Sequence, residues 1–410
     1  MEEKQLIPHL FRTEFRKITA VLCKRFGIAH LQIAEDIASD TFLKAFETWT
    51  YQGPPANPTA WLYSVAKNKA VNYLQRHHLY ESKIMPNLKS VINEMSTLEI
   101  DLSPQNTNDS QLQMMFAICH PSISVEAQIG LSLRILCGFG IDEIADAFLT
   151  NKETISKRLF RAREKLREEK INIDIPQPIE IESRLDTVLT TIYLLFNEGY
   201  YSTSQNTTLR KDLCLEAMRL CYLLIENEST NKPIVNALLS LMCFHASRFD
   251  ARLDQNGEMV LYEDQDISLW NAELISKGGY FLHCASKDQA NSKYHLEAGI
   301  AYWNTQREDS REKWENMLAL YDQLLDQEYS PFAALNRAYA LSKLHGKKSG
   351  IEEAEKLSMT SNQFYFALLG ELYSGLDNSR AIENFRKAMD LAKTQTDKNN
   401  LEKKLRNLKP

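Results

Sequence analysis

Apolar residues recur at intervals of three and four along most of this chain, which is the spacing of one face of an α-helix. The pattern is interrupted by a polar stretch within residues 91–110 and by a proline-containing stretch at 173–180. These interruptions divide the chain into helical blocks at 1–90, 111–172 and 181–410. We therefore expect an all-α protein with two small helical modules, two linkers and a larger helical domain.

The third block contains an internal repeat at an offset of 34 residues. Four pairs of residues match at this offset: Phe332 and Phe366, Leu335 and Leu369, Tyr339 and Tyr373, and Ala354 and Ala388. A period of 34 is the tetratricopeptide length, and Leu369-Gly370-x-x-Tyr373 fits the first helix of that repeat. Because two repeats are too few to be stable alone, we expect them to cap a larger helical domain. Chance similarity between two amphipathic helices is the alternative.

The first candidate interface is the helix predicted at residues 31–49. Its apolar face, on which we expect Trp49 to lie in the core, consists of Ala34, Ile37, Ala38, Phe42, Ala45, Phe46 and Trp49. Its polar face carries Asp36, Ser39, Asp40 and Lys44. Taken by itself, such a polar face is more typical of a solvated surface than of a binding site.

A loop with three prolines and one glycine follows at residues 50–59, and Thr59 is the predicted N-cap of the next helix. The outward positions of that helix carry groups that bond phosphates or base edges: Lys67, Asn68, Asn72, Gln75, Arg76, His77 and His78. The two histidines are a weak metal-ligand pair, because adjacent residues do not share a helix face.

Residues 141–166 predict two helices joined by a short turn, with Asn151 as the N-cap of the second helix. The inward stripe of the second helix is Ile155, Leu159, Ala162 and Leu166. Its outward positions are mostly cationic or polar: Lys152, Glu153, Ser156, Lys157, Arg158, Arg161, Arg163 and Lys165. These are the ingredients of a DNA-binding helix-turn-helix, in which the first turns read bases and the later cations contact phosphates. A cationic amphipathic surface helix is the alternative.

Charge supports the nucleic-acid interpretation only locally. The chain has a formal net charge of −6, yet residues 151–170 hold eight Lys or Arg against four Asp or Glu. Such a local excess of cations on one helix is the usual footprint of a DNA-binding surface.

The seven cysteines lie far apart without a CxxC pair, so we expect no disulfide framework, metal site or cofactor. No apolar run reaches the roughly 18 residues of a membrane helix, and Met1-Glu2-Glu3-Lys4 does not begin a signal peptide. A cytoplasmic protein with no membrane partner is expected.

These motifs resemble a known family, the extracytoplasmic-function sigma factors of the sigma-70 family. Residues 34–46 (Ala-Glu-Asp-Ile-x-x-Asp-Thr-Phe-Leu-Lys-Ala-Phe) and 61–74 resemble region 2 of these proteins. Residues 112–168 resemble their region 4 and contain the ending Arg158-Leu159-x-Arg161-Ala162-Arg163. The C-terminal block resembles the subfamily with a tetratricopeptide-like domain, and the segments that carry this resemblance are 195–201, 247–252 and 294–298.

The resemblance implies a sigma factor that binds core RNA polymerase through the clamp helices and the flap of its large subunits. It assigns polymerase binding to Asp36, Ser39, Asp40 and Lys44. It implies that the loop at 51–57 holds a flipped −10 base and that the helix-turn-helix holds the −35 duplex. The residues it assigns to DNA binding are Gln52, Gly53, Asn68, Asn72, Arg76, Lys152, Thr154, Ser156, Lys157, Arg158, Arg161 and Arg163. The protein would associate with the nucleoid when bound to polymerase. A regulatory role is implied for residues 181–410, and an unknown ligand or protein partner there is left open.

Two other functions remain alternatives. A tetratricopeptide-type helix-turn-helix regulator would explain residues 111–410 and leave the motifs at 31–78 unused. A hydrolase would use groups within 181–305, namely His245, Asp250, His295 and Glu297. We favour interhelical salt bridges for those groups, because no nucleophile motif accompanies them. We also expect no calcium site at residues 263–266, which lack the required glycine. The protein is therefore not expected to be an enzyme.

Overall fold

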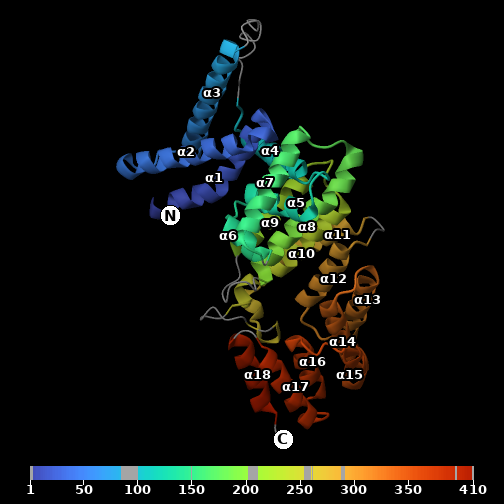
Figure 1. The fold of residues 1–410 in the computed structure, drawn as a ribbon. Coiled ribbons are helices and arrows are strands. Elements are labelled where there is room, and N and C mark those ends of the chain that lie inside the picture. The colour runs from blue at the N-terminus through green and yellow to red at the C-terminus, as the bar shows by residue number, and fades with distance from the viewer. Residues whose placement is uncertain are drawn as a thin grey trace. The chain divides into compact units, whose positions relative to one another are not determined.

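The computed structural model describes residues 3–84, 100–148, 150–201, 211–253, 260, 262–287, 291–392 and 395–408. These residues form α-helices, short 3-10 helices and loops, and none of them belongs to a β-strand (Figure 1). The expected all-α class is therefore confirmed. The chain divides into two compact units, Met1–Leu195 and Phe196–Pro410. The boundary lies inside a helix, after the predicted linker at 173–180.

The first unit begins with a long helix that packs against three others. Helix α1 contacts α2, α3 and α4, while α5, α6 and α7 pack against one another. The unit contains α1 (Glu3–Phe26), η1 (Ile28–His30), α2 (Leu31–Gln52), α3 (Pro58–Ile84), α4 (Pro104–Ile118), α5 (Val125–Ile135), α6 (Ile141–Ala147), α7 (Lys152–Glu168) and most of α8 (Pro178–Tyr201).

Helix α2 follows the predicted pattern with one exception. The face from Ala34 to Trp49 is buried, and the Trp49 ring lies 5.2 Å from the Trp61 ring, which confirms Trp49 as a core residue. The expectation for Phe46 is wrong, because this side chain is 60% exposed. Phe46 lies at the edge of the apolar face, on the side of Ser39 and Leu43, where the same helix is exposed.

Two helices begin earlier than the sequence pattern indicates. Pro58 is the first residue of α3, and Asn57 caps it by accepting a hydrogen bond from the Ala60 amide at 3.0 Å, so Thr59 is not the N-cap. Helix α4 begins at Pro104, within the stretch predicted as a linker. Ser103 caps that helix, and its first turns bury small polar side chains such as Thr107, which hide the helical pattern in the sequence. The rest of that stretch, up to residue 99, lies outside the described residues.

Polar contacts join the front and rear parts of the first unit. The Arg16 guanidinium on α1 donates a buried hydrogen bond of 2.9 Å to the Leu136 carbonyl at the end of α5. Helix α7 packs against η1, and its Arg163 lies 3.6 Å from the Glu35 carboxylate on α2. The two predicted modules therefore form one compact unit in this structure.

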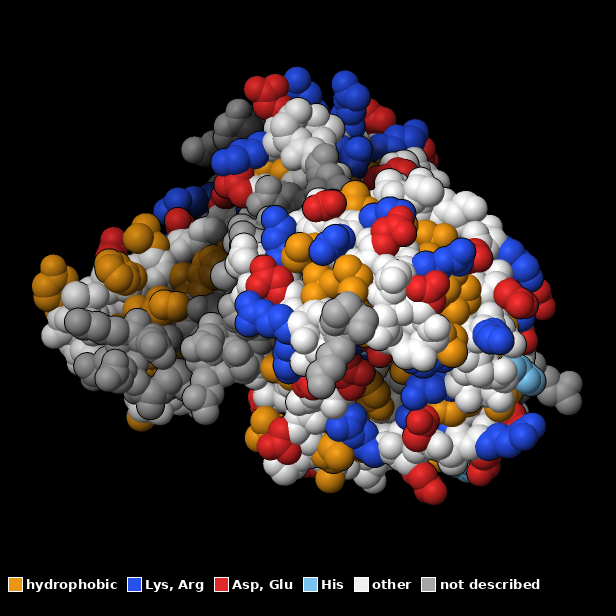
Figure 2. Space-filling model, turned by 90° about the horizontal axis from the view of Figure 1, so that it is seen from below, with side chains coloured by type: hydrophobic (Ala, Val, Ile, Leu, Met, Phe, Trp, Pro, Cys, Tyr) orange, Lys and Arg blue, Asp and Glu red, His pale blue; other side chains and the backbone are white. Residues whose placement is uncertain are grey.

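The second unit is a succession of helices from α9 to α18, each of which packs against the next (Figure 1). Its elements after α8 are α9 (Lys211–Glu226), α10 (Pro233–Ala246), η3 (Phe249–Ala251), η4 (Tyr262–Asp264), η5 (Ile267–Leu269), α11 (Ala272–Ala285), α12 (Lys293–Thr305), α13 (Arg311–Gln327), α14 (Pro331–His345), α15 (Lys347–Lys356), α16 (Gln363–Tyr373), α17 (Asn378–Leu391) and α18 (Gln395–Asn407). Lys, Arg, Asp and Glu side chains are interspersed on the face shown in Figure 2, so that face presents no field of a single sign.

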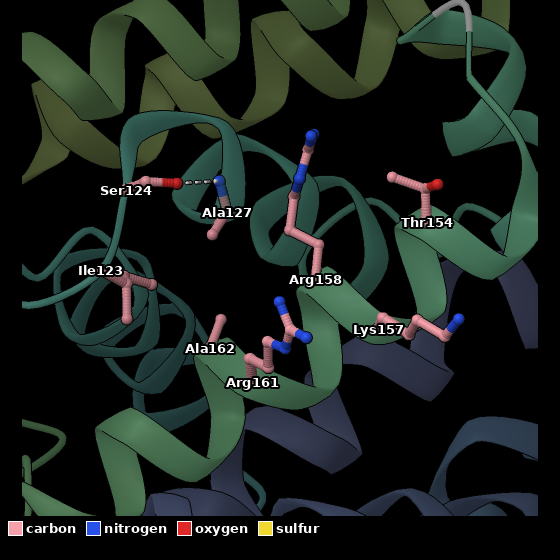
Figure 3. A pocket seen from close by; sticks show the side chains of 8 residues that line it. All are labelled: Ile123, Ser124, Ala127, Thr154, Lys157, Arg158, Arg161 and Ala162. Atoms are coloured by element: carbon pink, nitrogen blue, oxygen red, sulfur yellow. Dashed lines mark hydrogen bonds between the residues drawn. The ribbon is translucent and has the colours of Figure 1, made fainter.

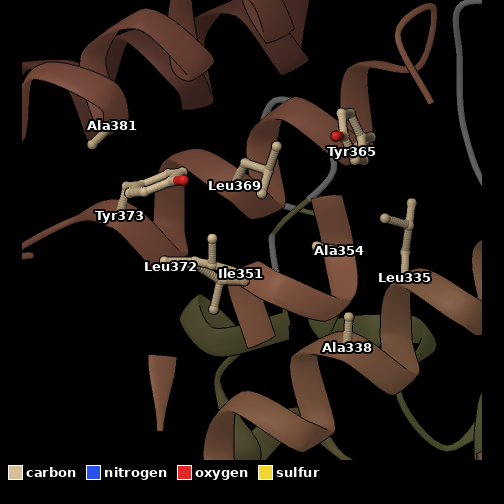
Figure 4. Packing of buried hydrophobic residues seen from close by; sticks show 9 residues of the cluster. All are labelled: Leu335, Ala338, Ile351, Ala354, Tyr365, Leu369, Leu372, Tyr373 and Ala381. Atoms are coloured by element: carbon tan, nitrogen blue, oxygen red, sulfur yellow. The ribbon is translucent and has the colours of Figure 1, made fainter. Parts of the chain in front are cut away.

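The predicted repeat corresponds to two helical hairpins, α14–α15 and α16–α17. Leu335 and Leu369 are buried at matching places in the first helices, and Ala354 and Ala388 are fully buried in the second helices. Most of these residues belong to one apolar cluster between the hairpins (Figure 4). The aromatic pair at the start of the repeat, Phe332 and Phe366, differs in exposure. Phe332 is 55% exposed and contacts Phe364, at 5.9 Å between rings, whereas Phe366 is half-buried against the cluster.

Candidate nucleic-acid interface

The helix-turn-helix predicted from the sequence is present as α6 and α7. The Asn151 side chain accepts a hydrogen bond of 2.8 Å from the Thr154 amide, which confirms the predicted N-cap. Ile155, Leu159, Ala162 and Leu166 are buried as expected and attach α7 to the rest of the unit. Leu149, in the turn between the two helices, lies outside the described residues.

Most of the predicted DNA-binding side chains of α7 are open to solvent. Lys152 and Lys157 have side chains 70% and 71% exposed, and Ser156 and Arg161 are also exposed. Thr154 and Arg158 are half-buried, with the Arg158 guanidinium 5.5 Å from the centre of the Phe148 ring. The first turns of α7 are therefore accessible for contact with a DNA groove.

Arg163 is placed differently from the other predicted cations. Its guanidinium pairs with Glu35, and the two side chains are only 27% and 12% exposed. The Arg163 Nε atom is buried and has no hydrogen-bond partner. In this structure Arg163 joins α7 to α2 and is not part of the exposed cationic face.

Sequence reasoning missed Phe160, an aromatic side chain on the exposed side of α7. It is 65% exposed and lies between the solvent-facing Lys157 and Arg161 in the sequence. The sequence pattern indicates this exposure, because residue 160 falls outside the inward stripe at 155, 159, 162 and 166. A large exposed apolar side chain on a cationic helix is suited to contact with a thymine methyl group or another apolar surface.

The front part of the unit presents a second set of polar groups. Gln52 ends α2, and Gly53 follows with φ of 73°, a conformation that side chains disfavour. Tyr51, beside them, is 89% exposed. On α3 the predicted Asn68, Asn72 and Arg76 are all exposed at intervals of four residues, which places them along one face. The side chains of His77 and His78 lie outside the described residues.

The four predicted polymerase-binding residues share the exposed face of α2. Asp36, Ser39, Asp40 and Lys44 are all exposed, and Lys69 of α3 lies 3.3 Å from the Asp40 carboxylate. Leu43, on the same face, is 57% exposed. The result is a polar surface with an apolar centre, a composition that suits a protein interface.

The residues considered for a hydrolase have separate local environments in the second unit. His245 is buried in α10 with its ring 4.7 Å from that of Tyr200, and burial, with Arg248 and Arg252 nearby, lowers the pKa of its imidazole well below the usual value. Asp250 is exposed and pairs with Lys211 at 2.5 Å, while His295 accepts from the Ser292 amide in a capping box. Within the described ranges, no three His, Cys, Asp or Glu side chains are grouped as metal ligands would be.

The acidic stretch at residues 263–266 is likewise occupied by contacts within the protein. Glu263 pairs with Lys404 at 3.0 Å, and Asp264 lies 3.8 Å from Lys403. The Asp266 side chain accepts from the Ser268 amide. These carboxylates therefore join or cap helices of the second unit.

Comparison with known proteins gives two family-model matches and a relative that covers most of the chain. Residues 10–79 match the family model of sigma-70 region 2, and residues 184–286 match a family of unknown function (DUF6596). An uncharacterized protein of Rhizobium meliloti (strain 1021), R00370, is 31% identical over 369 residues, which cover 88% of this chain and 87% of that protein. The chain belongs to the same family as R00370.

The match of residues 10–79 to sigma-70 region 2 supports the assignment of this chain to the sigma-70 family of sigma factors. The RNA polymerase sigma factor YlaC of Bacillus subtilis (strain 168) is 26% identical over 168 residues, covering 41% of this chain and 93% of YlaC. No solved structure matches the chain. Among the described helices, none is both long and apolar enough to span a membrane.

Proposed function

We propose that this chain is a sigma factor of the extracytoplasmic-function type, which binds core RNA polymerase and directs it to promoters. The observation that carries the proposal is the presence, in one compact unit, of a sigma-70 region 2 and a helix-turn-helix with an exposed cationic second helix. A helix-turn-helix regulator without polymerase binding would have no use for the first of these two parts.

Polymerase binding is proposed for the α2 surface of Asp36, Ser39, Asp40 and Lys44, which would dock on the clamp helices of the largest subunit. Its exposure and its mixture of carboxylates, hydroxyl and ammonium support this role. Charges at such an interface fix the register and raise the association rate more than they add affinity. The rear module would contact the flap.

DNA binding is proposed at two places. The loop after Tyr51 would capture a flipped −10 base, because stacking on an exposed aromatic ring contributes roughly 1–3 kcal/mol per base and offsets the cost of unpairing. Asn68, Asn72 and Arg76 on α3 would contact the neighbouring DNA. Helix α7 would enter the major groove of the −35 element, which stays double-stranded.

The second unit is proposed as a tetratricopeptide-like regulatory domain. Two successive hairpins with matching buried Leu and Ala positions support this name, and the offset of 34 residues is the length of that repeat. Whether this domain raises or lowers transcription is tested with a chain truncated after Pro176.

Run-off transcription with core polymerase tests the sigma role. The template is a pool of genomic upstream fragments, and the readout is the sequence of transcript 5′ ends together with co-purification of polymerase. The full chain is expected to give defined start sites, and D40K is expected to abolish polymerase binding because it reverses a charge in the proposed docking surface. D326K makes the same charge change at an exposed site at the end of α13 and serves as the control.

A chain truncated after Pro176 gives the sign of regulation by the remainder, since its activity will be higher or lower than that of the full chain. Absence of both polymerase binding and defined start sites with the full chain contradicts the proposed function.

A further inference from the structure

Two arginines of the second unit lie beside the same two aromatic rings. Arg248, which follows α10, and Arg307, which follows α12, each have the guanidinium carbon 5.2–5.9 Å from the centres of the Tyr262 and Trp270 rings. The two ring centres are 6.2 Å apart. One aromatic pair therefore holds two cations close together, although like charges at short range repel each other. We call these four residues the arginine–aromatic cluster.

This cluster is separate from the cationic surface of the helix-turn-helix. A cavity of about 440 Å³ lies between α5 and α7 in the first unit, and Figure 3 shows Arg158 and Arg161 extending into it. That cavity belongs to the DNA-binding surface proposed above. The arginine–aromatic cluster consists only of residues of the second unit, and none of them is among the predicted DNA-binding or polymerase-binding residues.

Within the part of the chain that the structure describes, no carboxylate pairs with either guanidinium of the cluster. Arg248 donates to the Tyr200 hydroxyl at 3.2 Å. Arg307 donates to the main-chain carbonyls of Tyr262 and Gln265, at 3.3 and 3.1 Å. All three acceptors are uncharged. Because a guanidinium has five N–H donors, each arginine keeps several of them for a further acceptor.

Acidic side chains that are close to the cluster in the sequence have other partners. Glu263 and Asp264 face lysines of α18, at 3.0 and 3.8 Å. The Asp266 carboxylate caps η5. Asp309, in the loop after α12, pairs with Lys343 at 3.1 Å. The positive charge of the two arginines is therefore not neutralised by these carboxylates.

The indole N–H of Trp270 is a further donor in the cluster. This side chain is 8% exposed, and its Nε1 atom is buried without a hydrogen-bond partner among the described residues. A buried donor without an acceptor is unfavourable, so it indicates an acceptor that the described protein atoms do not supply. Arg248, Tyr262 and Arg307 are only half-buried, which leaves the cluster partly open to solvent.

The charge of the cluster matches a phosphate group. A phosphate monoester carries roughly −1.5 to −2 charges at neutral pH and three strong acceptor oxygens, whereas a carboxylate carries one charge and two oxygens. Guanidinium groups that stack on aromatic rings present a planar fork of N–H donors that fits phosphate oxygens. Two uncompensated cations and an unused N–H thus favour a phosphate over a single carboxylate.

The surroundings of the cluster favour a small ligand over a nucleic acid. Residues 196–410, which form the second unit, contain 26 Lys or Arg against 30 Asp or Glu. A long polyanion is repelled by a domain with a net negative charge and requires an extended cationic surface. A small phosphorylated molecule needs only the local pair of arginines.

We propose that the arginine–aromatic cluster binds the phosphate group of a small phosphorylated molecule. The edges of the Arg248 and Arg307 guanidiniums hold the phosphate oxygens, and the Tyr262 and Trp270 rings keep both guanidiniums in place. Occupancy of this site links the segment between α10 and α11 to the loop after α12. The site would serve as the signal input of the regulatory domain. That regulatory role rests on the proposed function, whereas phosphate binding does not.

Isothermal titration calorimetry of the full chain with sodium phosphate, in sodium chloride at matched ionic strength, tests the binding site. R248Q and R307Q are each expected to weaken binding about ten- to a hundredfold, because each removes charge-assisted hydrogen bonds. W270F keeps the aromatic ring and removes the N–H, so it is expected to weaken binding roughly three- to tenfold. The control is R311Q, which removes an exposed cation of α13 that pairs with Glu315 at 2.7 Å, and it is expected to bind as wild type.

Competition on the wild-type chain tests the phosphate chemistry without any substitution. Sulfate, a tetrahedral dianion, is expected to displace phosphate, and acetate at the same concentration is not. Acetate that competes as well as sulfate overturns the phosphate assignment. The binding site is overturned if the wild-type chain binds no phosphate at millimolar concentrations, or if R248Q, R307Q and W270F all bind it as R311Q does. Circular dichroism in chloride establishes that each variant is folded.

Run-off transcription with core polymerase tests the regulatory role. The transcript yield of the full chain is expected to differ between phosphate and chloride at matched ionic strength, and R248Q is expected to remove that difference while R311Q keeps it. Phosphate binding without such a difference overturns the regulatory role and supports the site alone. If the full chain gives no defined start sites, the proposed sigma function fails, and the calorimetry still decides whether the cluster binds phosphate.

Discussion

Two neighbouring glycines in α11 should respond in opposite directions to the same substitution. A methyl group added at Gly278 would lie 2.7 Å from the ring of Phe244, whereas one added at Gly279 has no atom within 4 Å. Phe244 is 1% exposed and has Tyr302 against it at 5.8 Å between rings, so its ring has little room to retreat. G278A therefore overpacks the core between α10, α11 and α12, and G279A leaves it unchanged.

The expected magnitudes follow from two opposing effects. Alanine in a helix interior is favoured over glycine by roughly 0.5–1 kcal/mol, because glycine loses more backbone entropy on folding. Overpacking a tight core costs roughly 1–3 kcal/mol. G278A is thus expected to lower the free energy of unfolding by about 1–2 kcal/mol, and G279A to raise it by about 0.5–1 kcal/mol.

Thermal unfolding followed by circular dichroism measures the difference between these variants. For a unit of this size, 1 kcal/mol corresponds to roughly 2–4 °C in Tm, so the two variants should differ by several degrees in the transition of the second unit. Hydrogen exchange in α10, α11 and α12 assigns the change to this region. A G278A protein as stable as G279A would refute the reasoning, because it would mean that Phe244 moves aside at no cost.

Three further predictions concern single side chains. Glu35→Gln removes the carboxylate that faces the largely buried Arg163, so it should lower the free energy of unfolding by about 1–2 kcal/mol. A double-mutant cycle with Arg163→Gln, measured by urea denaturation, should give a coupling energy that shows the pair to be stabilising. Asn151→Ala should cost about 1 kcal/mol and reduce hydrogen-exchange protection at the start of α7, since it removes the N-cap. Burial, with Arg248 and Arg252 nearby, lowers the pKa of His245, so as the pH falls the unfolded chain binds a proton there before the folded chain does. The free energy of unfolding should therefore fall by up to about 1.4 kcal/mol for each pH unit below about 6.5. In denaturation measured across that range, His245→Gln should show a smaller fall.

The local chemistry of the helix-turn-helix was predictable from the sequence. Asn151 and the stripe from Ile155 to Leu166 act within one helix and its cap, so their spacing alone determines which side of α7 is buried. The face of Asp36, Ser39 and Asp40 on α2 was predictable for the same reason. In both helices a strong period of apolar residues is sufficient to orient the polar ones.

The features that sequence reasoning missed depend on neighbours that are distant along the chain. Phe46 has the right spacing for the core but lies at the edge of the apolar face of α2, where burial depends on whether another element covers that edge, and it is 60% exposed. Thr107 lies in a helix whose polar sequence resembles a linker, and it is buried where α4 packs against α1. The cavity beside Arg158 exists only because α5 and α7 come together. Periodicity reports the faces of one element and not which element covers them.

Arg163 connects the packing of the first unit with its proposed function. The resemblance assigned this residue to DNA, yet its charge is balanced by Glu35 of the region 2 part at 3.6 Å. Separation of α7 from α2 would break this ion pair, but water would then solvate both the arginine and the carboxylate. The net free-energy cost of separation is therefore smaller than the electrostatic attraction between the two groups. The buried hydrogen bond from Arg16 to the Leu136 carbonyl adds a second contact of the same kind. If the two modules hold the −10 and −35 elements separately, these contacts must be exchanged for contacts with polymerase and DNA. Arg163 would then join the exposed cations of α7 only after that exchange.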